Sequence, residues 1–314
     1  MSSEVKERVR TVHGVRRPRR FTMTEGKAGY IFLIPWFIGL TVIVVFPMIA
    51  SLYLSFTEFN PLGTPKWVGL ANYVQMFTSD PRYWNSVKVT LTYVALSVPI
   101  QLIFALILAV ALDKGLRGLN FYRSVYYLPS LLGGSVAIAL LWRQVFGASG
   151  MFNQVLGWFG IEAGSWIANP TTAVYTLVAL SAWMFGAPMV IFLAGLRQIP
   201  AEYYEAASVD GAGALRRFFS ITLPLLSPVI FFNLILQTIH AFQAFTPAYV
   251  VSDGIGGPVD STLFYTLYLY QQGFRYLHMG YASAMAWVLL AAVGIFTAIN
   301  FIVSKYWVFY GDEG

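Results

Sequence analysis

Four polar side chains interrupt a long apolar stretch in the second half of the chain: Asn233, Gln237, His240 and Gln243. The first three are spaced i, i+4 and i+7, so a helix would place them on one face. Amide and imidazole groups can hydrogen-bond a hydroxyl-rich solute, and leaving them unsatisfied at membrane depth is costly. The same residue types also join membrane helices to one another, so both interpretations stay open. His240 alone is more typical of a packed, neutral histidine than of a proton relay.

Aromatic side chains accompany this polar face. Phe242 and Phe245 lie next to it in the sequence, Trp183 lies in the apolar stretch before it, and Tyr281 in the one after it. Solute pockets typically combine aromatic walls with a few polar groups, and sugars offer apolar faces to aromatic rings. The candidate substrate path therefore consists of Asn233, Gln237, His240, Gln243, Phe242, Trp183 and Tyr281.

A second candidate site lies between positions 200 and 220. A short helix is expected after Pro200, with acidic residues in its first turns, where a helix N-terminus favours negative charge. Gly211 and Gly213 then end this helix, and a second amphipathic piece follows. Two helices joined by a sharp turn can fit into the groove of a partner protein. An ordinary amphipathic loop is the alternative, and the residues by themselves do not separate the two.

Membrane-spanning helices must position both sites. The chain has 314 residues, of which 57% are hydrophobic and 11% charged, against roughly 25% charged in an ordinary soluble domain. Long uncharged runs are typical of helices that cross a hydrocarbon core of ~30 Å, where no water can satisfy the backbone. The fold is therefore expected to be an all-α integral membrane fold with six transmembrane helices. These spans are predicted near 29–55, 87–112, 122–146, 171–196, 221–250 and 276–304.

The distribution of positive charge predicts the orientation of these helices. Most of the 20 Lys and Arg residues lie in the N-terminal tail, in the second and fourth loops and after the last span. By the positive-inside rule these segments, and therefore both termini, face the cytoplasm. The predicted domains are a basic cytoplasmic tail (1–28), a membrane domain (29–305) and a cytoplasmic C-terminal tail (306–314). The basic tail is interpreted as a topology signal with incidental attraction to membrane lipid, and no nucleic acid is expected as a partner.

Composition excludes several kinds of chemistry. The chain has no cysteine, which excludes disulfides, thiolate metal sites and cysteine nucleophiles. It has no G-x-x-x-x-G-K-[ST] phosphate-binding loop, so ATP is not expected to bind this chain. No metal site, cofactor or catalytic residue is predicted, and the chain is not expected to be an enzyme.

A family resemblance rests on the second candidate site. Glu205-Ala206-Ala207 and Asp210-Gly211-Ala212, followed by Leu223-Pro224, resemble the EAA motif of permeases of ABC importers. The likeness is to the carbohydrate-uptake branch in particular, with its maltose-type and glycerol-phosphate-type permeases. Similar stretches occur at 67–73, 121–129, 150–153 and 280–284. The loop 252–258 departs slightly from the family pattern.

The resemblance implies a fold and a mechanism. The fold would be the six-helix transmembrane domain of a type I (MetI-like) importer. In such importers two permeases form the path, and two ATPase subunits in the cytoplasm close on ATP and Mg. The EAA loop, here 200–220, docks into a groove of an ATPase subunit. The residues that match this role are Glu205, Ala206, Ala207, Asp210 and Gly211.

Partners and location follow from the same resemblance. The N-terminal segment and first external loop look like those of the first of two paired permeases, so a heterodimer with a second EAA-type permease is expected. An extracytoplasmic solute-binding protein would deliver a sugar or sugar-like solute, and a non-sugar solute is the alternative. The complex would lie in the cytoplasmic (inner) membrane of a bacterium or archaeon.

Two other classes of transporter fit the residues less well. A secondary transporter usually couples ions through intramembrane carboxylates, and no predicted span has Asp or Glu near its centre. A channel would need a selectivity segment, and none stands out.

Overall fold

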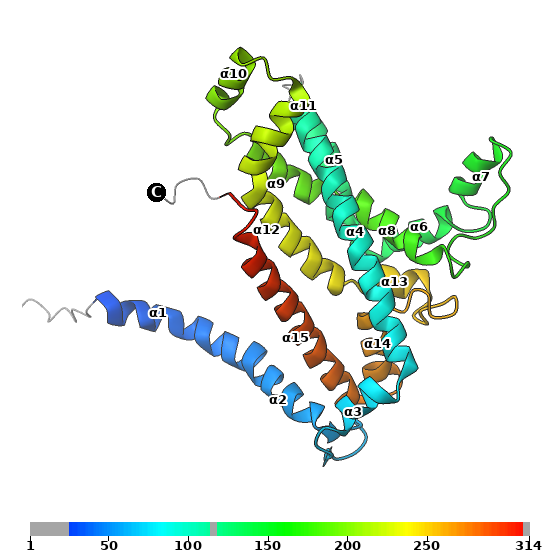
Figure 1. Ribbon diagram of the computed structural model, residues 1–314. Helices are drawn as coiled ribbons and strands as arrows, with labels where there is room; N and C mark the ends of the chain where they lie inside the picture. Colours follow the sequence, from blue (N-terminus) through cyan, green and yellow to red (C-terminus); the bar gives the residue numbers. More distant parts are fainter. Residues whose placement is uncertain (1–24, 114–117, 310–314) are drawn as a thin grey trace, which may run out of the picture. The chain divides into compact units, whose positions relative to one another are not determined.

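The computed structural model describes residues 25–113 and 118–309, and these divide into two units at the boundary between Ala50 and Ser51. Most of the predicted basic tail and the last part of the predicted C-terminal tail lie outside the described residues. Figure 1 follows the helices along the chain. The two units are described separately below.

The first unit is helical from its first described residue. Helix α1 (Glu25–Leu40) passes through a π-helical turn, η1 (Thr41–Val45), into α2 (Phe46–Ser55), which ends inside the second unit. Phe32–Ser55 is a predominantly apolar helical stretch of 24 residues, long enough to cross a membrane. This stretch confirms that the first predicted span is helical.

Three further helices of membrane-spanning length lie in the second unit. They are α4 (Pro81–Asp113), α15 (Met279–Ser304) and a run from Ala214 to Val251. This run contains α11 (Ala214–Arg217), η2 (Phe218–Thr222), α12 (Leu223–Phe242) and α13 (Thr246–Val251). The predictions of apolar helices near 87–112, 221–250 and 276–304 are confirmed.

The third and fourth predicted spans are not continuous helices. Helices α5 (Leu119–Leu132) and α6 (Val136–Val145) meet at 96°, and α8 (Ala173–Trp183) and α9 (Gly186–Leu196) meet at 42°. At the first bend Ser135 begins a new helix, where its Oγ accepts from the backbone N–H of Ile138. The described residues thus hold four membrane-length helices, or up to six if each bent pair is one span.

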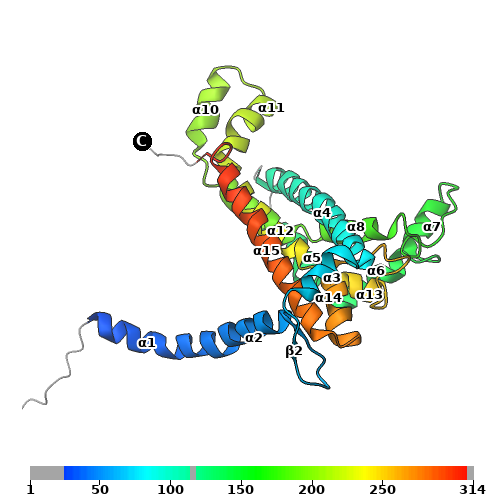
Figure 2. The same cartoon turned by 60° about the horizontal axis from the view of Figure 1, so that its bottom comes forward.

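Short elements close the two ends of the second unit. One end carries a two-stranded antiparallel ribbon, β1 (Thr57–Glu58) and β2 (Lys66–Trp67), with α3 (Ala71–Thr78), α14 (Tyr265–Tyr270) and η3 (Gln271–Arg275). Helix α7 (Met151–Gly157) follows α6. Helices α10 (Ala201–Val209) and α11 lie at the opposite end, as Figures 1 and 2 show.

Helix α4 packs against α8, α9, α12 and α14. Glycines let neighbouring helices approach closely. A Cβ on Gly186 would overlap the backbone carbonyl oxygen of Tyr126, and one on Gly195 would lie 2.8 Å from side-chain atoms of Leu226 and Val229. Small residues are typical of such membrane-helix interfaces, because packing there depends on van der Waals contact.

We expect Gly186→Ala to destabilise the protein by about 1–3 kcal/mol, because the added methyl group forces α5 and α9 apart. Thermal unfolding of the purified protein in detergent would measure the effect. Gly294→Ala is the matched control, since nothing lies within 4 Å of a Cβ at this position of α15. Equal melting temperatures for the two variants would contradict the close packing of α5 and α9.

Candidate functional site

A cavity of about 280 Å³ lies in the second unit, where three interruptions of the helices come together. They are the α5–α6 bend at Gly134, the α8–α9 bend at Met184, and the segment between α12 and α13. The other walls are side chains of α4, α8 and α12. The residues that line the cavity are Tyr93, Gln101, Gly134, Ser181, Met184, Gln237, His240, Ala241, Gln243, Ala244, Phe245, Thr246 and Pro247.

The α8–α9 bend exposes a backbone carbonyl that has no regular helical donor. The N–H of residue 188 would normally bond to the carbonyl of Met184, but Pro188 has none. Instead, Nε2 of Gln101 and Oγ of Ser130 each donate to this oxygen at 2.9 Å. Ser181 donates to Oε1 of Gln101 at 3.4 Å. These contacts fix Gln101, which is 5% exposed, against the cavity wall.

A side chain also donates to a free backbone carbonyl at the interruption between α12 and α13. The carbonyl of Ala244 accepts a hydrogen bond from Oγ1 of Thr266, just after α14 begins. Gln243 ends α12, and its backbone N–H bonds to the carbonyls of Ile239 and His240. Irregular backbone at membrane depth is tolerated only where it is buried in protein or lines a cavity. Broken helices of this kind are typical of solute sites in transporters.

The structure brings together part of the predicted substrate path. Gln237, His240 and Gln243 line the cavity, and so does Phe245. Asn233 does not: it is fully buried, and its Nδ2 donates to the carbonyl of Val229 at 3.2 Å. Its Oδ1 has no hydrogen-bond partner in the described part of the chain.

The predicted aromatic residues lie elsewhere. Phe242 packs against Phe296 with ring centroids 5.9 Å apart, and Trp183 packs against Trp142 at 6.0 Å. Tyr281 lies toward the end that carries α3, where its hydroxyl donates to Asp80 at 2.6 Å. None of these three rings lines the cavity.

Four polar residues of the cavity were missed by the sequence analysis: Tyr93, Gln101, Ser181 and Thr246. Gln101 carried the same signal as Gln237, because it too is an amide within an apolar span. The polar side chains described in the cavity wall are amides, hydroxyls and the imidazole of His240, and the wall has no carboxylate, lysine or arginine. The wall is therefore suited to hydrogen-bonding an uncharged polar solute rather than to neutralising an ion.

The predicted helix–turn–helix between positions 200 and 220 is confirmed. Helix α10 ends in a Schellman motif, in which the N–H of Ala212 bonds to the carbonyl of Ala207 at 2.9 Å and that of Gly211 to Ser208 at 3.1 Å. Gly211 has φ +73°, in the left-handed region that favours glycine. The following helix is tied back by Arg217, which donates to Oγ of Ser208 at 2.7 Å.

This segment exposes most of its side chains. Glu205, Ala206, Asp210 and Gly211 are exposed, and Ala207 is half-buried. Several apolar side chains are exposed as well, including Tyr203, Val209 and Leu215. Exposed apolar groups gathered beside acidic groups are typical of an interaction surface.

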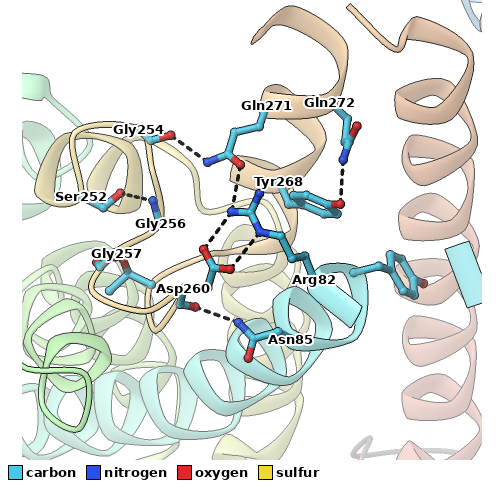
Figure 3. A network of polar contacts seen from close by, with 12 residues as sticks. Arg82, Asn85, Ser252, Gly254, Gly256, Gly257, Asp260, Tyr268, Gln271 and Gln272 are labelled. Atoms are coloured by element: carbon cyan, nitrogen blue, oxygen red, sulfur yellow. Dashed lines mark hydrogen bonds and ion pairs between the residues drawn. The ribbon is translucent and has the colours of Figure 1, made fainter. Parts of the chain in front are cut away.

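A polar network joins the elements at the opposite end (Figure 3). Arg82 at the start of α4 makes a two-pronged ion pair with Asp260, with Nε–Oδ2 2.9 Å and Nη2–Oδ1 2.8 Å. Asn85 donates to the backbone carbonyl of Asp260 at 2.9 Å, and Gln271 donates to that of Gly254 at 2.8 Å. Together these contacts fix the loop between α13 and α14, in which Asp260 has φ +54°.

Asp80 connects three helices at this end. Its Oδ1 accepts from the backbone N–H of Tyr83 and so caps α4, while its Oδ2 accepts from the hydroxyls of Tyr268 and Tyr281, both at 2.6 Å. Burial raises the pKa of Tyr268, and so does its hydrogen bond to Asp80. The hydroxyl therefore stays protonated and donates across the physiological pH range.

The fold defines a multi-pass helical membrane protein whose broken helices enclose a polar cavity. Residues 77–306 match the family described as "Binding-protein-dependent transport system inner membrane component". The match covers more than half of the chain, and the chain belongs to this family. It is thus a transport subunit and not an enzyme.

Several relatives are similar over nearly their whole length. The probable ABC transporter permease protein YesP of Bacillus subtilis (strain 168) is 55% identical over 290 residues, covering 92% of this chain and 94% of the relative. The lactose transport system permease protein LacF of Rhizobium radiobacter is 32% identical over 282 residues, covering 88% and 94%. The arabinooligosaccharides transport system permease protein AraP of B. subtilis is 32% identical over 285 residues, covering 88% of each chain.

The fold is shared with a solved transporter. One chain of a bacterial alginate ABC transporter, in complex with an alginate pentasaccharide-bound periplasmic protein, superposes with a TM-score of 0.78 and 21% identity. The likeness covers 90% of this chain and 95% of that one. The predicted type I (MetI-like) fold is confirmed.

A double-mutant cycle would test the polar network. We expect Arg82→Gln and Asp260→Asn each to lower the melting temperature, and the double variant to lose less than the sum. Because both side chains are about one-third exposed, the coupling energy should be about 1 kcal/mol or below. Arg143 and Asp253 form the matched control pair, with Asp253 66% exposed, so their coupling should be smaller. Strict additivity at Arg82 and Asp260 would contradict a role for the ion pair in fixing the loop.

Proposed function

We propose that this chain forms one half of the membrane path of an ATP-driven importer for a sugar or sugar-like solute. The lining of the cavity carries this proposal. It offers amide, hydroxyl and imidazole groups together with the rings of Tyr93 and Phe245. A site for a neutral sugar needs hydrogen-bonding groups and apolar walls but no charged groups. This lining supplies the hydrogen-bonding groups and the apolar walls. The permeases named for lactose and arabinooligosaccharides support the same solute class.

The second half of the path would come from another permease of the same family. The cavity is not fully enclosed by this chain, as expected of a path that is shared between two subunits. The resemblance to the first of two paired permeases favours a heterodimer. The alginate transporter, solved with its periplasmic protein, supports delivery of the solute by an extracytoplasmic binding protein.

ATP and Mg would be held by two ATPase subunits, since this chain has no phosphate-binding loop. We assign docking on such a subunit to the α10–α11 segment. Glu205 and Asp210 would accept charge-assisted hydrogen bonds from the partner, while Ala206 and Ala207 permit close approach. Gly211 would maintain the turn that sets the angle between the two helices.

The proposed orientation places this segment in the cytoplasm, as the positive-inside rule requires for Arg197, Arg216 and Arg217. Both termini would then be cytoplasmic, and the Arg82–Asp260 network would face outward. Closure of the ATPase subunits would push on α10 and α11, and α12 would transmit the movement to the cavity because it follows η2 without interruption. Solute would enter from outside and leave toward the cytoplasm.

Uptake by the complete transporter in proteoliposomes tests the solute path. We expect Gln237→Leu and His240→Leu each to reduce uptake of the transported sugar about fivefold to tenfold, the loss for one hydrogen bond to solute. Lactose, maltose and arabino-oligosaccharides would be the labelled probes. Gln144→Leu is the control, because this exposed amide lies outside the cavity. Unchanged uptake in both cavity variants would remove this face of α12 from the path.

The turn can be tested by a pair of glycine variants. Gly211→Ala forces a side chain into the left-handed region at a cost of about 1–2 kcal/mol, so we expect normal insertion but weakened coupling of ATP hydrolysis to uptake. Gly213→Ala is the control, because Gly213 has φ −67° and open space around it. The ratio of ATP hydrolysed to solute imported would be measured in proteoliposomes. An unchanged ratio in Gly211→Ala would contradict the role of the turn.

A further inference from the structure

An apolar groove of about 350 Å³ lies on the outside of the second unit, between α4 and the start of α12. Ile103, Leu106, Ile107 and Val110 form one wall, and their spacing places them on one face of α4. Phe219 and Leu223 lie on the facing wall. Almost all the surface of the groove is apolar, and it shares no residue with the solute cavity.

The groove adjoins a second hollow of about 360 Å³. The two share Val110 and Phe218. Most of the surface of the second hollow is apolar as well, but its lining adds Asp113, Tyr204 and Arg217. An apolar groove thus adjoins a hollow that contains charged groups.

The charges around the second hollow favour an anion. Asp113 lies 3.7 Å from Arg197 (Oδ1–Nε), so its charge is largely compensated. Arg217 lines the hollow and uses Nη1 to hold Ser208, and its guanidinium has further N–H groups. Arg216 precedes it in the last turn of α11 and is exposed. Tyr204 and Thr222 hydrogen-bond to each other at 3.0 Å and carry no charge.

The charge pattern of both walls places the edge of the membrane at the junction of groove and hollow. On α4 the uncharged run ends at Asp113, and on the other wall it begins directly after Arg217. Both walls therefore change from charged to apolar at the same end. A molecule that fills both spaces needs an apolar chain on the membrane side and a negative group at the interface.

We propose that the groove and the hollow bind an anionic phospholipid. One acyl chain lies along α4 between Ile103 and Val110, and the phosphate headgroup contacts Arg217 and Arg216. A helix of a second permease fits the groove less well, because membrane-helix interfaces favour small residues. The lining consists of large side chains, and Ile107 and Phe219 are 59% and 62% exposed. A flexible acyl chain fills such a surface without close backbone approach.

This lipid would contact η2, the segment that joins α11 to α12. Its binding is independent of which solute the cavity accepts. Lipid binding can therefore be measured without transport. A failure to bind lipid would not contradict the proposed function, and a failure to transport sugar would not contradict lipid binding.

Native mass spectrometry of the full chain, purified with its partner subunits, measures the binding. Phosphatidylglycerol and phosphatidylcholine with identical acyl chains are the probes. We expect one phosphatidylglycerol to be retained in preference to phosphatidylcholine. Arg217→Gln should weaken its binding about fivefold, the factor for one cation beside an anionic lipid, and Arg217→Lys should restore most of it. Arg275→Gln at the other end of the unit is the control and should change nothing. Equal retention of both lipids by the unaltered protein would overturn the proposal.

A second pair of variants tests the groove itself. Ile107→Trp should fill it and abolish the retained lipid, whereas Leu290→Trp, at an exposed position of α15, should not. Melting temperatures would show that both variants fold. A benzophenone amino acid placed at Ile107 should capture lipid on irradiation in membranes, and capture of a polypeptide instead would show that a partner subunit occupies the groove and would reject the lipid.

Discussion

The lack of water inside a bilayer is the constraint on which this structure depends. Every backbone carbonyl in the hydrocarbon region needs a partner within the protein. Pro188 removes the donor that the carbonyl of Met184 would have in a regular helix, and Gln101 and Ser130 replace it. Gln101 belongs to α4 and Ser130 to α5, so a single oxygen joins these helices to the α8–α9 bend. The cavity lies beside this junction because the helices cannot close up where their backbone is irregular.

Polar side chains are concentrated at three levels of the second unit. At one end Asp80 and Arg82 connect α4 to α14, α15 and the loop before α14. At the other, Gly211 and Arg217 hold the exposed α10–α11 segment in shape. The cavity lies between them, among packed apolar helices. Under the proposed function, solute entry and energy supply would be separated by the length of these helices.

Much of the fold could be predicted because its signals are local. An uncharged apolar run requires a helix wherever it lies in the bilayer, and the turn at Gly211 follows from glycine's access to positive φ. The breaks in the third and fourth spans also had visible causes, in Gly133, Gly134 and Pro188. The bend angles of 96° and 42° could not be predicted from these residues, because each angle depends on the neighbours against which the two halves pack.

The sequence by itself determined that the chain crosses the membrane on helices, that positions 200–220 form a helix–turn–helix, and that α12 has polar side chains. Only the tertiary structure decided which of them face the cavity. Gln237 and His240 do, whereas Asn233 is enclosed. Tyr281 of α15, also predicted for the substrate path, bonds to Asp80 instead. The cavity also depends on Gln101, whose contact with Met184 joins residues 83 positions apart. Helical spacing assigns side chains to a face, but the packing of distant segments decides what that face meets.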